Sequence, residues 1–316
     1  MIRNSENCSN YYVAYGVTLE CDLDLSRYLM AGKTTRCKVR IAEELAGIPC
    51  HYPEHTGIRS DSHGRQLALY SDTGPGTSDS GQNWCFEVKD IVRFFWVNKT
   101  RVIGFERGEF CTEELLAFWL IHIFLPIHFT LEGLYEFIHA SAVEVAGDTV
   151  LFTGPSHGGK STMTDYFLQQ GHTLVSDDKV ATFVKSSQYF AVPSHPNHRP
   201  YRRFEDLGSR VIDFSPDPRL LRVFYALRAA DPEADVSIEE ITGHEKFAQI
   251  LPGHMFNFPL MQEKRLRYLA GMVSAVPVFR VGVPWDLERL GDVHDAIAGH
   301  LKNIRLNYHN SSVEHY

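Results

Sequence analysis

The chain has 316 residues, 44% of them hydrophobic and 22% charged, enough for one large globular domain or two ordinary ones. Thirty-nine acidic residues outnumber 31 basic ones, and the formal net charge of −8 argues against a nucleic-acid or anionic-membrane partner. Any basic site must therefore be local.

The six cysteines all lie in the first 111 residues, without a CxxC pair or a regular spacing. Neither a zinc site nor a disulfide framework is indicated, so we expect reduced thiols. The start, MIRNSENCSN, has no apolar core of the kind that signal peptides carry. These features predict a cytoplasmic protein.

The first part of the chain, residues 1–133, is predicted to be a small β-rich domain that ends in a buried apolar helix. Short apolar runs at 86–97 and 100–107 indicate strands, and the polar stretch 71–81 indicates a loop. The most apolar run, LLAFWLIHIFLPIHF at 115–129, is shorter than a membrane span and includes two histidines and a proline. We expect it to be a core helix.

Residues 134–316 change to strands alternating with helices, which predicts an α/β domain. SAVEV and TVLFT form a predicted hairpin, followed by a helix over 161–170 and a buried strand, TLVS, at 173–176. Further along, the expected elements are a hairpin (VATFV and YFAV), strands VFYALRA and SIEEI, a helix to about Met255 opened by a Thr242–Glu245 capping box, a helix over 262–276, the strand VPVFRVGV and a terminal helix over 292–301.

The segment LFTGPSHGGKST carries the P-loop spacing, with Gly154, four residues, then Gly159, Lys160 and Ser161. A strand that ends in such a turn and opens a helix directs backbone N–H groups at an anion. Lys160 can reach the β- and γ-phosphates of a nucleotide, and the Ser161 hydroxyl can bind Mg²⁺. The predicted nucleotide contacts are Gly154, Ser156, His157, Gly158, Gly159, Lys160, Ser161 and Thr162.

Two adjacent acids, Asp177 and Asp178, follow the strand TLVS. Mg²⁺ in such sites needs a second anchor at the end of a neighbouring strand, and one acid can hold the metal while the other accepts the proton of an attacking hydroxyl. The alternative is that the pair only caps a turn.

The segments IHASAV, GPSHGGKS and QGHTLVSDDKV, with their spacing, resemble the catalytic domain of HPr kinase/phosphorylase, a relative of phosphoenolpyruvate carboxykinase. YYVAYGVTLECDLDL and VPVFRVGVPWDLERL resemble a subgroup of HPr-kinase-like proteins associated with lasso-peptide biosynthesis, which phosphorylate the precursor or mature peptide. SIEEITGHEKF does not resemble the segment that the family uses for the reverse, phosphorylase reaction.

The resemblance implies an HPr kinase-like P-loop core and an ATP- and Mg²⁺-dependent serine kinase. It implies that Asp177 is the general base, that Asp178 and Ser161 hold Mg²⁺, and that His139 lies beside the transferred phosphoryl group with Lys160. The family also forms oligomers, so a homo-oligomer is possible by analogy. Without the resemblance, His139 would be interpreted as a hydrogen-bonded core residue.

The densest cationic segment, HPNHRPYRR at 195–203, follows a predicted strand. Arg199, Arg202 and Arg203 could bind a substrate carboxylate or the transferred phosphate through bidentate contacts. The alternative is a solvated loop with salt bridges to acids such as Glu205 and Asp206. A second basic run, Lys264, Arg265 and Arg267, is expected on a solvated helix face.

Other enzyme classes lack their motifs, since the chain has no GxGxxG, HEXXH, GxSxG or protein-kinase HRD and DFG set. The leading hypothesis is phosphorylation of a Ser or Thr hydroxyl of a peptide, with Asp177 activating that hydroxyl. The alternatives are a kinase of another protein or small-molecule hydroxyl, and a nucleotide-binding regulatory protein without catalysis.

Overall fold

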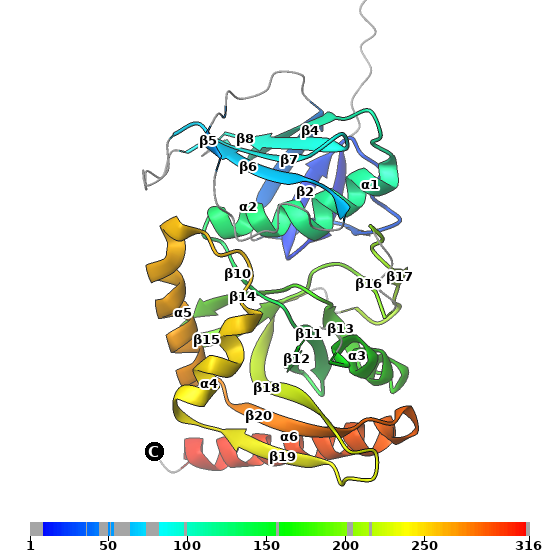
Figure 1. Ribbon diagram of the computed structural model, residues 1–316, viewed down its shortest axis with the longest axis vertical. Coiled ribbons are helices and arrows are strands. Elements are labelled where there is room, and N and C mark those ends of the chain that lie inside the picture. Colours follow the sequence, from blue (N-terminus) through cyan, green and yellow to red (C-terminus); the bar gives the residue numbers. More distant parts are fainter. Residues whose placement is uncertain are drawn as a thin grey trace, which may run out of the picture.

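The computed structural model describes residues 9–35, 37–43, 50, 52–53, 64–73, 82–97, 100–155, 158–200, 205–214 and 217–313. Over these ranges, the fold is mixed α/β and contains two nine-stranded sheets and a two-stranded one. A long helix lies between the two large sheets (Figure 1). The five described cysteines, Cys21, Cys37, Cys50, Cys85 and Cys111, are free thiols.

The first large sheet takes the order β3-β1-β2-β4-β9-β8-β7-β6-β5. Its strands are β1 Asn10–Ala14, β2 Val17–Cys21, β3 Met30–Ala31, β4 Lys38–Glu43, β5 Tyr52–Pro53, β6 Leu67–Ser71, β7 Trp84–Val88, β8 Val92–Trp96 and β9 Val102–Arg107. The predicted apolar run at 86–97 is thus a hairpin of two strands, turned at Asp90 with a φ of 64°. Most of the loop predicted at 71–81 lies outside the described residues.

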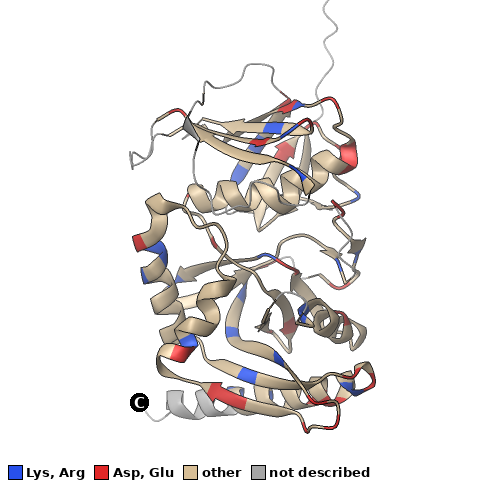
Figure 2. Ribbon diagram, viewed as in Figure 1, with Lys and Arg blue, Asp and Glu red and all other residues tan. Residues whose placement is uncertain are grey.

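The helix between the sheets consists of α1 Glu113–Phe118, a π-helical segment η2 Trp119–Phe124, and α2 Leu125–Leu131. Pro126 cannot donate a backbone hydrogen bond and its ring would press on the carbonyl of His122, and the wider π turn, with Leu125 N–H bonded to the Leu120 carbonyl, relieves that contact. The helix is uncharged along most of its length (Figure 2).

By length and composition, Glu113–Leu131 could cross a membrane, yet 83% of its most apolar stretch is buried inside the protein. Phe118, Trp119, Phe124 and Phe129 are at most 1% exposed and pack with both the first sheet and Phe137 below it. The prediction of a buried core helix is confirmed, and the helix joins the two layers in one apolar cluster.

The second large sheet takes the order β10-β14-β15-β18-β12-β11-β13, with β20 joined to β18 and β19 to β20. Its strands are β10 Glu136–Ile138, β11 Ser141–Val145, β12 Asp148–Thr153, β13 Thr173–Ser176, β14 Val180–Lys185, β15 Gln188–Val192, β18 Arg219–Ala230, β19 Ser237–Ile241 and β20 Val278–Pro284. β12, β18 and β20 are mutually parallel, so their carboxyl ends lie at one edge. β16 Asn197–His198 and β17 Ser209–Arg210 form the small sheet.

Helices cover both faces of the second sheet (Figure 1). The helices are α3 Lys160–Gln169, α4 Gly243–Ile250, α5 Gln262–Ala275 and α6 Leu290–Val313, with 3₁₀ turns Leu251–Gly253, Pro259–Met261 and Leu287–Arg289. α3 and α6 share one apolar cluster, with Phe152 and Phe167 in it, while α4 and α5 share another around Phe224 and Met272.

Three helix predictions need correction. The helix after Thr242 ends at Ile250 rather than near Met255. The capping box is also absent: the Thr242 side chain makes no capping hydrogen bond, and the Glu245 carboxylate pairs with Arg280. The terminal helix starts at Leu290 and runs to Val313, beyond both predicted ends. The basic face of α5 is only partly solvated, since Arg265 is 7% exposed and donates to Asn257.

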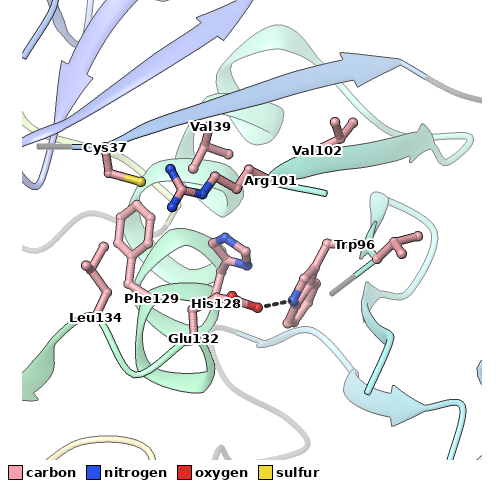
Figure 3. Close-up of a pocket in the computed structure, with 10 residues that line it drawn as sticks. Cys37, Val39, Trp96, Arg101, Val102, His128, Phe129, Glu132 and Leu134 are labelled. Atoms are coloured by element: carbon pink, nitrogen blue, oxygen red, sulfur yellow. Dashed lines mark hydrogen bonds between the residues drawn. The ribbon is translucent and has the colours of Figure 1, made fainter. Parts of the chain in front are cut away.

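A cavity of about 140 Å³ lies in the first layer, between α2 and the strands above it (Figure 3). On the wall of this cavity, Trp96 Nε1 donates to Glu132 Oε1 at 3.1 Å, and the Arg101 side chain extends toward Cys37 and Phe129 (Figure 3). Burial raises the pKa of Glu132 and lowers that of His128 to about 3. The residues that line this cavity all lie between positions 37 and 134, so it belongs to a different layer from the site described next.

Candidate functional site

The glycine-rich turn, residues 154–161, lies where β12 ends and α3 begins, at the carboxyl ends of the parallel strands. Gly154 has a φ of 150° and Gly159 a φ of 82°, values that side chains rarely adopt. A Cβ on Gly154 would lie 3.0 Å from the Leu227 carbonyl oxygen, and one on Gly158 would lie 2.9 Å from that of Pro155. Glycine is therefore required by conformation and by space. Ser156 and His157 lie outside the described residues.

Lys160, the first residue of α3, turns back into the turn. Its Nζ donates to the carbonyl oxygens of Gly154 at 3.1 Å and Pro155 at 2.9 Å, and the residue is only 3% exposed. The Lys160 ammonium is thus held at the N-terminus of α3, where its positive charge and the helix dipole both favour an anion. Ser161 is half-buried and Thr162 exposed on the same first turn.

Asp177, at the end of β13, is the acid that lies beside the glycine-rich turn. Its Oδ1 accepts from Ser141 Oγ at 2.9 Å and lies 3.5 Å from Ser161 Oγ, while its Oδ2 accepts from His198 Nδ1 at 2.9 Å and the Arg199 N–H at 3.0 Å. Burial would raise the pKa of Asp177, but the bonds from His198 and Arg199 outweigh it and hold the pKa at about 2. The side chain is 2% exposed.

Asp178 points the other way and pairs with His139. Its Oδ1 lies 3.3 Å from His139 Nδ1, and that nitrogen also donates to the Asp178 main-chain oxygen at 3.1 Å. Lys179 Nζ donates to Oδ2 at 3.1 Å. Burial opposes ionisation, yet the Lys179 ammonium, with the hydrogen bond from His139, holds the pKa of Asp178 well below its ordinary value. The side chain of Asp178 is 15% exposed and that of His139 is 29% exposed.

The positive φ of 71° at Asp178 explains why adjacent acids face different neighbours. The chain turns sharply after Asp177, so the Asp177 carboxylate lies against Ser141, Ser161 and His198, and the Asp178 carboxylate lies against His122, His139 and Lys179. The sequence predicted that both acids belong to one site. The structure places Asp177 beside Ser161 and Asp178 beside His139. Which acid is the base and which holds the metal stays a prediction.

The apolar helix supplies a site residue that the sequence did not indicate. His122, in η2, is 1% exposed, and its Nε2 accepts from Lys179 Nζ at 2.6 Å and Arg199 Nη1 at 2.9 Å. Burial and those cations hold the pKa of His122 well below its ordinary value, so the ring is neutral. In the sequence this histidine is one polar residue in an apolar run, and no local pattern connects it with Lys179, which lies 57 positions further along the chain beside the two acids.

The cationic segment 195–203 divides at the limit of the described residues. Arg199 is 6% exposed and its guanidinium lies over the Phe118 ring at 5.5 Å, so it is not part of a solvated loop. Glu205 pairs with Arg65 and accepts from Trp119 Nε1 at 2.7 Å. Arg202 and Arg203 lie outside the described residues, and their substrate-binding role stays a prediction.

The turn and the acids fit a nucleotide with Mg²⁺. The glycines leave backbone that an anion can approach, and Ser161 and Asp177 converge as hydroxyl and carboxylate, the oxygen donors that Mg²⁺ takes. Over the described part of the chain, no group of three His, Cys, Asp or Glu could hold a metal alone.

No protein-family model matches the chain, and no curated protein matches it either. Among solved structures, the chain is similar to the Hpr(Ser) kinase/phosphatase from Coxiella burnetii, at 14% identity and a TM-score of 0.32 over 57% of this chain and 96% of that one. A likeness this distant assigns neither a family nor an activity to the chain.

Proposed function

We propose that the protein transfers the γ-phosphoryl group of ATP to a hydroxyl group, with Mg²⁺ bound at the glycine-rich turn. The observation that carries the proposal is the convergence of three chemically distinct groups on one edge of the sheet: the turn with Lys160, the Ser161–Asp177 pair, and the Asp178–His139 pair. A turn that only reversed the chain would need neither the Ser161–Asp177 pair nor the Asp178–His139 pair.

The turn and Lys160 hold the phosphates, through backbone N–H groups and one ammonium. Ser161 and Asp177 hold Mg²⁺, since their oxygens already lie 3.5 Å apart and Asp177 is kept ionised by its own donors. When bound, Mg²⁺ neutralises charge on the phosphate oxygens. Lys160 exchanges its bonds to the Gly154 and Pro155 carbonyls for the phosphates.

Asp178 accepts the proton of the attacking hydroxyl, and His139 orients the Asp178 carboxylate. This assignment is the other way round from the one expected from the sequence. The Asp177 side chain is 2% exposed and lies beside Ser161, whereas the Asp178 side chain, although Lys179, His122 and His139 lie against it, is 15% exposed. A base must lie within hydrogen-bond reach of its substrate, and the more exposed of the two carboxylates is the one that a substrate hydroxyl can approach.

The acceptor in this proposal is a Ser or Thr hydroxyl of a peptide, and the resemblance at both ends of the chain favours a lasso-peptide precursor or product. A hydroxyl acceptor suits a site with a carboxylate base, since hydroxyls need a proton acceptor to become good nucleophiles. Arg202 and Arg203 are the candidate contacts to a peptide carboxylate, because they follow Arg199 closely in the segment 195–203.

The test is incubation with Mg²⁺, ATP and paired peptides that end in serine, threonine or alanine, followed by mass spectrometry. We expect one added phosphoryl group on the serine and threonine peptides and none on the alanine peptide. Phosphorylation of a sugar, a nucleoside or a folded protein instead would retain the phosphotransferase and overturn the peptide acceptor. ATP binding without any transfer would favour the regulatory nucleotide-binding alternative.

A further inference from the structure

A second feature adjoins the glycine-rich turn: an apolar cavity of about 250 Å³ on the α3 side. Its floor is formed by side chains that are almost fully enclosed, with Met163 at 1% and Leu227 at 2% exposure. At its rim, Trp285 is 54% and Leu287 74% exposed. Two large apolar side chains therefore remain in solvent at the entrance of an apolar hollow.

The topology places this cavity at the carboxyl ends of the parallel strands. β12 leads into the glycine-rich turn, Leu227 lies near the end of β18, and the chain leaves β20 at Pro284 to run directly into Trp285. Ligands of open α/β sheets bind in the crevice outside those ends. A Cβ on Gly159 would lie 3.7 Å from Trp285 Cζ3, so the indole lies against the turn itself.

We propose that this cavity receives the purine base of the nucleotide, with the Trp285 indole as the face on which the base stacks. The inference rests on the proposed function, because the cavity is continuous with the turn that would hold the phosphates. Its volume is below the roughly 300–1,000 Å³ of sites for whole drug-sized ligands and suits a single ring system. Apolar walls and one exposed indole select a flat aromatic group over a sugar or a second phosphate.

Asp286 supplies the polar contact at the same rim. Its Oδ1 accepts from the Glu288 N–H at 2.9 Å, which fixes the start of the Leu287–Arg289 turn and keeps the carboxylate at the cavity. A carboxylate accepts from amino groups, which the Watson–Crick edges of adenine and guanine both present. Cytosine carries such an amino group too, so Asp286 favours a base with an amino group over inorganic phosphate chains, and the preference for a purine rests on the size of the cavity.

The experiment measures the dissociation constants of ATP, GTP, CTP and inorganic tripolyphosphate, by calorimetry, for the wild-type chain, Trp285→Ala and Phe110→Ala. Phe110 is 57% exposed in the other layer and is the matched control. We expect Trp285→Ala to weaken ATP and GTP about 10-fold, the scale of lost base stacking, and to leave tripolyphosphate unchanged. Phe110→Ala should alter none of the four.

Tryptophan fluorescence gives an independent readout on the unmodified chain. Of its four tryptophans, Trp84, Trp96 and Trp119 are at most 5% exposed, so acrylamide reaches Trp285 selectively. We expect ATP to protect Trp285 from acrylamide and tripolyphosphate not to.

The outcomes separate this inference from the function beneath it. Tight binding of ATP and tripolyphosphate to the wild type, with both unchanged in Trp285→Ala, overturns the base site and retains the phosphate site. Equal weakening of ATP and tripolyphosphate also overturns it, because Trp285 would then support the turn rather than the base. Binding of neither ligand to the wild type overturns the proposed function and the base site together.

Discussion

The Ser161 hydroxyl lies 3.5 Å from Oδ1 of Asp177, although the two residues stand at the start of a helix and the end of the following strand. β13 does not pair with β12 directly; β11 lies between them. The acid thus reaches the turn from one strand further along the sheet. This short distance supports a metal ion shared by Ser161 and Asp177. The glycine-rich turn and the two acids can then be tested separately.

The first prediction concerns Lys160. Lys160→Ala should weaken ATP binding and lower phosphoryl transfer by at least about 10³-fold, because it removes the ammonium at the phosphate-binding turn while the glycines keep their shape. Calorimetry and a transfer assay measure the two effects, with Lys185→Ala, an exposed lysine on β14, as control. Wild-type turnover in Lys160→Ala would overturn the phosphate role of the turn.

The second prediction separates the two acids. Asp178→Asn should leave Mg²⁺-dependent ATP affinity close to the wild type and lower transfer by about 10²–10⁴-fold, the range for loss of a general base. Asp177→Asn should weaken ATP binding in Mg²⁺ and bring it to the affinity measured in EDTA. The opposite pattern would restore the assignment made from the sequence.

Local pattern identified much of this architecture. The strand, glycine-rich turn and helix around Lys160 were predicted because spacing, apolar strand residues and glycines act over a dozen positions. The buried helix was predicted for the same reason, since an apolar run with His122 and Pro126 inside it is poor membrane sequence. The predicted elements of the second part all appear, with errors concentrated at helix ends.

Long-range geometry could not be predicted in the same way. Which acid faces Ser161 depends on a backbone turn at Asp178, and nothing in the letters DD distinguishes the two. The burial of Arg199 and Arg265 depends on tertiary packing, so the sequence offered Arg199 as a substrate contact or a solvated loop residue and Arg265 as part of a solvated helix face. His122 enters the site through a π turn, a distortion that arises from Pro126 and tertiary packing together.

The third prediction concerns stability. Asp148, at the start of β12, accepts from Arg222 at 3.0 Å and Arg305 of α6 at 2.6 Å with a side-chain exposure of 9%. Burial would raise the pKa of Asp148, but the two arginines outweigh it and lower the pKa. Asp148→Asn should therefore reduce the free energy of unfolding by about 1.5–3 kcal/mol at pH 7.

The pH dependence follows from the sign of that shift. A carboxyl whose folded pKa is depressed stabilises the fold above its ordinary pKa, roughly 3.9, and loses this contribution as pH falls through the folded value. The difference between wild type and Asp148→Asn should accordingly shrink below about pH 4. Denaturant titrations at several pH values measure it, with the exposed Asp22→Asn as control. A difference independent of pH would indicate packing rather than charge.

The fourth prediction concerns His122, the contribution of the apolar helix to the site. Its Nε2 accepts from Lys179 and Arg199, and Lys179 in turn donates to Asp178, so the histidine shares the cation that holds the proposed base ionised. His122→Leu keeps a similar volume and removes the acceptor, which frees Lys179 to pair more closely with Asp178 and makes that carboxylate a poorer base.

Transfer by His122→Leu should fall about 10-fold or more at saturating ATP, with the dissociation constant for ATP unchanged. His122→Gln, whose amide oxygen can accept from the same cations, should recover part of the loss. Thermal unfolding of both variants controls for packing, since a purely structural histidine would lower the melting temperature and leave the rate per folded molecule intact. Recovery by glutamine with equal melting temperatures would identify His122 as a positioning residue, and equal rates in all three proteins would reduce it to a core side chain.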